Sequence, residues 1–267
     1  ANTGFYNGYV RAITNYKNQW AAMNNAFNTE GISIDGGLFR SKKRPAFMGA
    51  GLTYFTDRAG VAKLRKTYIQ LNISGIVKLG SKSALSVGLS GGSASMNGNY
   101  NDLTYSSQFN GNNIDPNATS GENTGRQSTS TDVAAGIAYE FARYRRDADH
   151  DDVLRFRVSF GAYHLNQPVQ DFWAGSNYRL PMRLCYALTS VYDITDTKFT
   201  VTPTFVFQQQ GSYQEMVLGS YLKYRTGAGT KVTGVKTQDA IGFGMFYRVN
   251  ESLIPKLIYD LGDYSIA

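Results

Sequence analysis

The sequence alternates between apolar and polar residues with a period of two over most of its length. Ile69, Leu71 and Ile73, for example, are separated by Gln70 and Asn72. A period of two predicts β-strands whose two faces meet different environments. The predicted strands cover residues 8–20, 29–40, 46–56, 66–79, 83–96, 130–144, 153–165, 181–194, 198–209, 213–225, 238–249 and 252–259, and another begins at Tyr264. The stretch nearest to a helical pattern, 18–28, is expected to form a single turn at most.

The predicted strands are too long for an ordinary soluble sandwich. Strands of soluble sheets average about 5–6 residues, whereas a strand that crosses a bilayer needs about 9–11. The connections form a short set (79–83, 194–198, 209–213 and 250–252) and a long set (97–129, 167–180 and 226–237). Short turns on one rim and long loops on the other are typical of outer-membrane barrels, which in bacteria have an even number of strands. We therefore expect one all-β domain over residues 1–267, a transmembrane antiparallel β-barrel of about 14 strands with short periplasmic turns and longer extracellular loops.

Composition excludes several other classes of protein. The chain has 42% hydrophobic and 18% charged residues, with 19 Tyr and 15 Phe, whereas a disordered chain has fewer aromatics and more charge. Cys185 is the single cysteine, which excludes a disulfide framework and a cysteine-based zinc site. The net charge of +7 comes without the basic stripe of a nucleic-acid-binding module. No apolar run approaches the length of a transmembrane helix. Residues 1–9 lack the features of a signal peptide, so we expect the chain to begin after processing or within a longer sequence.

The alternation also predicts which side chains face lipid and which face the interior of the barrel. Expected on the lipid side are Leu71, Ile73, Phe156, Val158, Phe205 and Leu218. The polar residues expected inside are Arg11, Lys17, Asp35, Gln70, Asn72, Lys78, Glu140, Arg155, Arg157, Arg183, Glu215 and Lys223. Small residues share the inner face, namely Gly49, Gly51, Ser86, Gly88, Ala134, Gly136, Gly242 and Gly244. Because small side chains leave space, we expect the lumen to be either a channel or a receptacle for a plug.

Aromatic residues and one proline lead to two further expectations. Rings with a polar tip favour the lipid–water interface, so aromatic residues near strand ends are expected to form interfacial belts. These residues are Tyr54, Phe55, Tyr139, Phe141, Tyr144, Tyr163, Phe172, Trp173, Tyr224 and Tyr247. Pro203 lies in the middle of a predicted strand and has no N–H to donate to a neighbouring strand. We expect a bulge or an interrupted ladder at residues 202–204.

Two kinds of side chain are candidates for a chemical role. His164 and Asn166 suggest a barrel phospholipase, but Leu165 stands where a serine nucleophile is expected, which favours a histidine at the rim. Two sets contain residue types that bind calcium, namely Asp147, Asp149, His150, Asp151 and Asp152, and Asp115, Asn117, Thr119, Gly121 and Glu122. Neither set has the spacing of a calcium loop. We therefore expect polar turns at both places, and no catalytic residue, metal or cofactor.

The long loop at residues 97–129 is the predicted site of partner binding. Loops of this length are either functional or disordered. Its content of Asn, Ser, Thr and Gly makes a self-packed core improbable, so we expect the loop to order only against a partner. Tyr100, Tyr105 and Phe109 would supply the contact area, because aromatic residues dominate interface hot spots. The alternative is a loop without a role.

Several motifs in register resemble the PorP/SprF family of type IX secretion in the Bacteroidota. They are YVRAITNYKNQW at 9–20, the turn at 57–60, VAAGIAYE at 133–140, FGAYHLNQP at 160–168, YRLPMR at 178–183, TPTFVFQQQ at 202–210 and MVLGSYLKY at 216–224. The resemblance covers nearly the whole chain. The opening segment expected before Ala1 and the closing strands expected after Ala267 are not in this sequence.

The resemblance implies a non-enzymatic outer-membrane barrel that works with the type IX secretion or gliding machinery. Members of the family help to export, or hold at the cell surface, large secreted proteins with a type B C-terminal domain. The implied partners are such a surface protein, other type IX secretion components and outer-membrane lipid, with no nucleic acid. No catalytic residues are implied. An outer-membrane channel or small-solute transporter is the alternative function, and an outer-membrane enzyme is a third.

Overall fold

The computed structural model describes most of the chain. The described residues are 1–6, 8–20, 27–41, 44–98, 103–115, 117–119, 127–146, 151–170, 177–226, 239–261 and 264–267. The stretch of the possible helical turn, 21–26, lies outside them, and so do the rings of Phe172 and Trp173. Among the described residues, no helix is long and apolar enough to cross a membrane.

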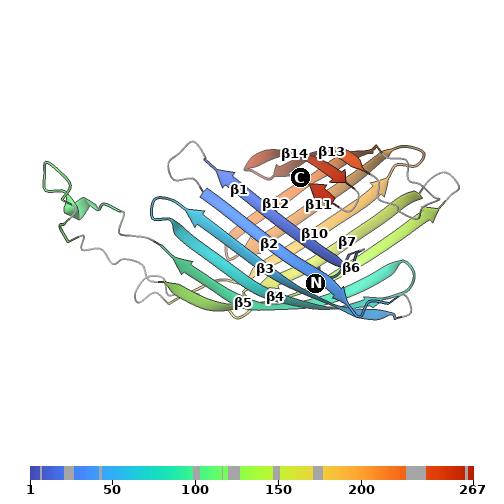
Figure 1. Ribbon diagram of the computed structural model, residues 1–267, viewed down its shortest axis with the longest axis horizontal. Helices are drawn as coiled ribbons and strands as arrows, with labels where there is room; N and C mark the ends of the chain where they lie inside the picture. Colours follow the sequence, from blue (N-terminus) through green and yellow to red (C-terminus); the bar gives the residue numbers. More distant parts are fainter. Residues whose placement is uncertain are drawn as a thin grey trace.

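Thirteen strands form one antiparallel sheet, as the alternation predicts. Each long strand pairs with the long strands before and after it, in the order β1-β2-β3-β4-β5-β6-β7-β10-β11-β12-β13-β14-β15 (Figure 1). The strands are β1 Val10–Gln19, β2 Phe27–Leu38, β3 Ala46–Ala59, β4 Leu64–Lys78, β5 Ser83–Asn97, β6 Ser128–Arg146, β7 Asp151–Tyr163, β10 Arg183–Asp193, β11 Phe199–Gln210, β12 Tyr213–Arg225, β13 Ala240–Arg248, β14 Ser252–Leu261 and β15 Tyr264–Ile266. A short hairpin, β8 Val169–Gln170 with β9 Tyr178–Arg179, lies between β7 and β10.

The sheet curls around a central space, which we call the lumen (Figure 1). Its curvature is compatible with a β-barrel, and β1 and β15 are its two edge strands. In the part of the chain that the structure describes, these two edges do not pair with each other. The predicted all-β fold is therefore confirmed, and the sheet itself holds one strand fewer than the even number expected for a closed barrel.

The strand order divides the connections between two rims. We call the end where β1 begins the N-terminal rim, and the opposite end the loop rim. The two longest connections, 98–127 and 164–182, both lie at the loop rim, as expected of a barrel with long loops on one side. The separation is incomplete, because the connection 226–239 belongs to the N-terminal rim and the tight turn at 211–212 belongs to the loop rim.

The predicted inner and outer faces of the strands are confirmed. Leu71, Ile73, Val158 and Leu218 are exposed on the convex face. Phe156 shares the parity of Val158 on β7, and Phe205 pairs with Leu218. The intervening side chains point into the lumen, where Ser74 and Ser86 are buried. Apolar groups outside and polar groups inside reverse the arrangement of a soluble protein, which is the pattern of a transmembrane barrel.

The ladder between β10 and β11 is interrupted at Pro203. The pairing runs from Arg183 opposite Gln210 to Thr189 opposite Thr204 and resumes at Tyr192 opposite Val201 in the same register. The pairing of β11 with β12 is complete, including Pro203 opposite Ser220. The missing N–H of proline therefore removes contacts on one side only, and the alternative of a bulge is wrong because the register does not shift.

The aromatic residues expected at the membrane interface divide between the two faces. Outward-facing rings include Tyr54, Tyr224 and Tyr247, and their place in a belt stays a prediction. Phe55 and Tyr163 instead line a cavity of the lumen, so the belt prediction is wrong for these two. The strand parity decides this, because odd-numbered residues of β3 and β7 point inward.

Aromatic side chains fill the lumen beside the C-terminal strands. The rings of Tyr221 on β12 and Phe246 on β13 pack edge to face with centroids 5.0 Å apart. Each ring lies over a glycine of the neighbouring strand: a Cβ built on Gly244 would lie 2.5 Å from the Tyr221 ring, and one on Gly219 would lie 2.5 Å from the Phe246 ring. The predicted small inward residue Gly244 therefore makes room for a ring, not for water.

Candidate functional site

The N-terminal segment, residues 1–6, lies inside the lumen against the strands from β2 to β7. Phe5 is its anchor, with only 4% of its surface exposed. The Phe5 ring packs in a cluster with Phe47 on β3, Ile76 on β4 and Ala138 on β6. The guanidinium of Arg157 lies over the same ring, 4.7 Å from its centroid, and a cation in this position is attracted by the aromatic face. The segment is thus held by residues that lie far from it in the sequence.

The lumen wall binds the N-terminal segment through the carbonyl groups of alternate residues. The Ser86 hydroxyl donates to the carbonyl oxygen of Ala1 at 2.6 Å, and the Ser74 hydroxyl donates to that of Thr3 at 2.6 Å. Arg157 Nη2 donates to the carbonyl oxygen of Phe5 at 2.6 Å. These donors stand on β5, β4 and β7. The wall therefore holds the segment by its main chain, which turns at residues 2–5, where the N–H of Phe5 donates to the carbonyl of Asn2 at 3.2 Å.

Asp35 on β2 is the acceptor for the rest of the segment. Its carboxylate accepts the N–H of Gly4 at 2.7 Å and the Nε–H of Arg11 at 3.0 Å. The Tyr6 hydroxyl donates to the backbone carbonyl of Asp35 at 2.7 Å. Loss of solvation raises the pKa of the Tyr6 phenol above its ordinary value, and the Asp35 carboxylate acts in the same direction. The phenol therefore stays protonated and keeps its role as a donor.

Glycines of the wall and of the segment let the two backbones approach closely. A Cβ atom on Gly49 would lie 2.3 Å from the carbonyl oxygen of Thr3, and one on Gly88 would lie 2.2 Å from the nitrogen of Ala1. Gly4 itself has φ +64°, and a Cβ there would lie 2.8 Å from the Cα of Gly49. Gly136 is also near, with its virtual Cβ 3.6 Å from the Cβ of Ala1. Of the two predicted roles for the small inward residues, a receptacle is the one observed here.

Ion pairs connect many of the polar residues predicted to face the lumen. Arg11 pairs with Asp35 at 3.0 Å, Arg157 with Glu140 at 3.1 Å from Nε, Lys223 with Asp260 at 2.7 Å, and Arg248 with Glu215 at 3.0 Å. Three of these pairs join neighbouring strands, whereas Lys223 on β12 meets Asp260 on β14 across β13. Paired charges cost less free energy to dehydrate than isolated charges do, because the attraction between the partners offsets part of the hydration that each one loses.

His164 and Asn166 attach the end of β7 to the start of β6. His164 Nδ1 lies 2.9 Å from Asp132 Oδ1, and both side chains are buried. The Asn166 side chain accepts the N–H of Val133 at 3.2 Å and donates to the carbonyl of Thr131 at 2.6 Å. The regular β6–β7 pairing ends before this point, so Asn166 replaces a strand partner. His164 thus lies at the rim, as predicted, but inside the lumen, whereas a barrel phospholipase needs it on the outer face.

Asp132 is a lumenal residue that the alternation alone does not single out. It is 1% exposed and also receives the amide of Gln70 at 3.4 Å. His164 itself has φ +58°, a conformation unusual for a residue with a side chain. In the sequence, this cluster is indicated by the close spacing of His164 and Asn166 after a strand. The acidic partner, Asp132, can be identified only when β6 and β7 are paired.

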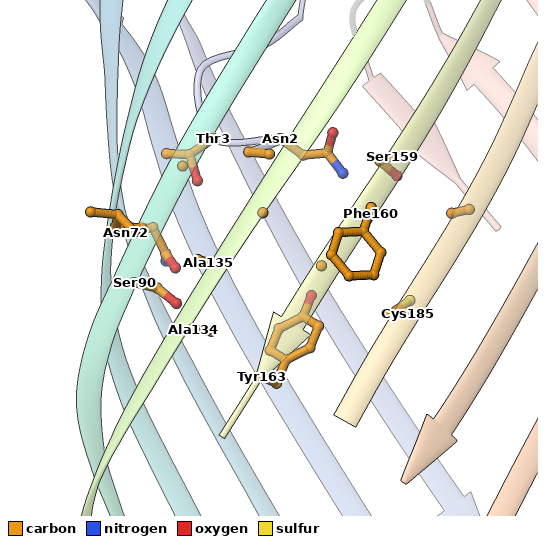
Figure 2. A pocket seen from close by; sticks show the side chains of 16 residues that line it. Asn2, Thr3, Asn72, Ser90, Ala134, Ala135, Ser159, Phe160, Tyr163 and Cys185 are labelled. Carbon is orange, nitrogen blue, oxygen red and sulfur yellow. The ribbon is translucent and has the colours of Figure 1, made fainter. Parts of the chain in front are cut away.

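Cavities remain in the lumen between the described residues. One of about 250 Å³ opens near the N-terminal rim and is lined by Phe5, Tyr6, Arg40, Lys78 and Glu140, among others. The mid-lumen cavity, of about 240 Å³, is lined by Ala1, Asn2, Thr3, Tyr163, Cys185 and small residues of β5 and β6 (Figure 2). The loop-rim cavity, of about 430 Å³, is lined by Asp57, Lys66, Asp132, Tyr163, His164 and Arg183, among others. Tyr163 lines both the mid-lumen cavity and the loop-rim cavity.

The long connection at the loop rim contains a small folded hairpin, formed by residues 105–115 and 117–118. The 3₁₀ turn η1, Ser106–Gln108, begins it, and Phe109 bridges to Ile114. Gln108 is buried and donates from Nε2 to the carbonyl of Ala118 at 3.0 Å. Figure 1 shows η1 projecting beyond the rim. The expectation that this loop orders only against a partner is therefore wrong for the hairpin, because its polar side chains satisfy the turn internally.

The aromatic residues proposed to bind a partner have different positions in this loop. Tyr100 lies outside the described residues. Tyr105 is half-buried, and its N–H donates to the Gln108 side chain at 3.0 Å. Phe109 is 54% exposed and its bridge partner Ile114 is 50% exposed, so two apolar side chains lie together on the surface of a polar hairpin.

The candidate calcium ligands fall largely outside the described residues. This applies to 147–150, to the side chains of 151–152, and to 121–122. Asp115 is described, and its carboxylate accepts the N–H of Asn117 at 2.9 Å, the contact of an ordinary polar turn.

Comparison with known proteins identifies the family to which this sequence belongs. A family model described as "Type IX secretion system membrane protein PorP/SprF" matches residues 1–267. No curated protein and no solved structure matches the chain.

Proposed function

The chain belongs to the PorP/SprF family of type IX secretion system membrane proteins, and on this premise we propose that it is a non-enzymatic outer-membrane barrel. In this role it helps to export, or to anchor at the cell surface, a large protein with a type B C-terminal domain. It acts together with other components of the type IX secretion or gliding machinery. The single observation that carries the proposal is the combination of a lumen partly occupied by residues 1–6 with a structured hairpin at the loop rim that has apolar side chains at its tip.

The side chains and the N-terminal segment inside the lumen favour an anchoring role over the alternative of a diffusion channel. Residues 1–6 occupy the side next to β2–β7, and Tyr221 with Phe246 occupies the side next to β12 and β13. A general porin keeps a water-filled path, whereas a barrel that holds a partner needs only a rigid frame for its loops. Several of the lumenal charges are paired with one another, which weakens the attraction of the wall for a charged solute.

The hairpin at the loop rim offers a surface that suits a protein partner. Phe109 and Ile114 expose apolar area at its tip, and apolar side chains surrounded by polar ones are common at the centres of interfaces. Internal hydrogen bonds of Gln108 hold the tip in shape before any partner arrives. A preformed surface loses less conformational entropy on binding than a disordered loop does.

Co-purification from detergent-solubilised outer membranes tests this proposal. We expect one large surface protein to co-purify with the full chain, and we expect deletion of 98–126 to leave the barrel assembled but to weaken capture. A Phe109→Ser/Ile114→Ser double variant should reduce capture at least tenfold, which corresponds to about 1.4 kcal/mol. Val61→Ser is the matched control, because Val61 is 51% exposed in the β3–β4 turn at the same rim. Unchanged capture by both loop variants would leave the hairpin without a role in binding.

The alternative functions predict different outcomes. Rapid solute flux through the unmodified chain in liposomes would favour a channel. Hydrolysis of a lipid or peptide that disappears in His164→Ala would favour an enzyme, although the buried pair with Asp132 speaks for a structural histidine.

A further inference from the structure

The N-terminal segment separates the cavities of the lumen from one another. Phe5 and Tyr6 line the cavity at the N-terminal rim, whereas Ala1, Asn2 and Thr3 line the mid-lumen cavity. Tyr163 lines both the mid-lumen cavity and the cavity at the loop rim. We infer that residues 1–6 are a plug that closes the lumen between the two rims, and that their displacement joins the cavities into one path along β3–β7.

The way in which the plug is held fits a part that can leave while the barrel stays intact. Residues 1–6 belong to no strand, so the ladders of the sheet do not depend on them. Their attachment consists of hydrogen bonds and of one buried ring, Phe5. Asp35 accepts from Gly4 and Tyr6, and side chains of the wall donate to carbonyl groups of the segment; these donors are Ser74, Ser86, Arg157, Arg11 and Arg40. Contacts of this kind can break together, because they share one short segment, while the strand pairs on both sides remain.

The wall is shaped for the plug more closely than a water-filled lumen would require. Glycines stand at the two places where the plug backbone comes nearest, Gly49 beside Thr3 and Gly88 beside Ala1. Gly75 on β4 and Gly91 on β5 face outward instead, and a Cβ atom built on either of them would have no other atom within 4 Å. The glycines of the inner face are therefore needed for a close approach, whereas the outward pair is not.

The inference goes beyond the proposed function, since closure of the lumen concerns the permeability of the membrane and not the capture of cargo. A barrel in this membrane that stood open would leak small solutes. On the opposite side of the lumen, Tyr221 and Phe246 pack against each other, and both belong to strands and cannot leave. Residues 1–6 are thus the part of the lumenal contents that can move to open a path.

A pair of matched glycine variants tests the plug in the full-length chain. Gly49→Ala/Gly88→Ala places two methyl groups where the plug backbone lies and should expel it. Gly75→Ala/Gly91→Ala adds the same two methyl groups to the outer face of the neighbouring β4 and of β5, and should change nothing. Both proteins are purified in detergent, checked for folding by their heat-dependent mobility on gels, and reconstituted into planar bilayers and liposomes.

Two readouts decide the outcome. The native Cys185 lines the same cavity as Asn2 and Thr3, so departure of the plug should speed its reaction with a bulky maleimide at least tenfold. Single-channel conductance, absent in the control, should appear in the expelled-plug variant. A rise in both supports the plug. Labelling without conductance overturns the closing role, and values equal to those of the control overturn the inference as a whole.

A second double variant keeps the inference testable if Gly49→Ala/Gly88→Ala misfolds. Ser74→Ala/Ser86→Ala removes the two serine donors without adding volume, and it should raise Cys185 labelling and conductance in the same direction by at least threefold. If this variant folds and both readouts stay at the level of the unmodified chain, the inference fails whatever the glycine variants do.

Discussion

The carboxylate of Asp35 accepts the backbone N–H of Gly4 at 2.7 Å, although the two residues are 31 positions apart in the chain. The same carboxylate accepts two bonds from Arg11, at 3.0 and 3.1 Å. Asp35 is 8% exposed, so water cannot replace these contacts. This one side chain therefore ties the N-terminal segment and β1 to β2.

Removing that carboxylate should destabilise the protein and free its N-terminus. In Asp35→Ala, the Gly4 N–H and the Arg11 guanidinium lose a buried acceptor, which costs about 1–3 kcal/mol. Urea unfolding in detergent measures the loss, and proteolysis near residue 8 should become faster. Glu251→Ala is the control, since this exposed partner of Arg248 should contribute less than about 1 kcal/mol. Equal stability of the two variants would contradict the role of Asp35.

Arginine substitutions on β7 test the orientation of the barrel wall. Phe156 faces outward and Ser159 faces the lumen. Phe156→Arg should cost about 2–4 kcal/mol if it lies near the bilayer midplane, and less than half of it should fold into vesicles under conditions in which the parent folds fully. Ser159→Arg should fold like the parent. If the two arginines are tolerated equally, the assignment of faces on this strand is wrong.

The pair of His164 and Asp132 should behave as one unit. Their side chains are in contact at 2.9 Å, so the effects of His164→Ala and Asp132→Ala should not add, with a coupling of about 0.5–3 kcal/mol in a double-mutant cycle. Urea unfolding of the two single variants and the double variant measures it. Asp260→Ala serves for comparison, because Asp260 pairs with Lys223 on the C-terminal strands, and its effect should add to that of His164→Ala. Additivity in both cycles would show that the contact carries no energy.

Pro203→Thr should repair the ladder between β10 and β11. Because the ladder with β12 is complete, an N–H supplied at position 203 faces Ser190 on β10, and one new hydrogen bond stabilises by about 0.5–1.5 kcal/mol. Amide exchange should show protection at residue 203. Pro255→Thr is the matched control, because β14 at Pro255 pairs with β13 only and β15 pairs with it further along. A freely exchanging amide at 203 would mean that the interruption has another cause.

The strands and their faces could be predicted from the sequence because the period of two is a local signal. Leu71 and Asn72 differ in polarity and are adjacent, so one must point outward and the other inward wherever the sheet lies. The same reasoning located Pro203 as a break in hydrogen bonding. It could not distinguish the outward-facing Tyr54 from the lumenal Phe55, because aromatic rings suit either face and a shift of one residue reverses them.

The contents of the lumen were decided by tertiary structure alone. Small residues such as Gly49 and Gly88 indicated space, but their sequence neighbours do not reveal what fills it. Residues 1–6 have no periodic pattern, and their partners Ser74, Ser86 and Arg157 come together only when the strands curl into a wall. Asp132 likewise meets His164 only through the pairing of β6 with β7. Periodicity reports the environment of each residue along its own strand, whereas closing the sheet around a segment depends on contacts between distant residues, which leave no local pattern in the chain.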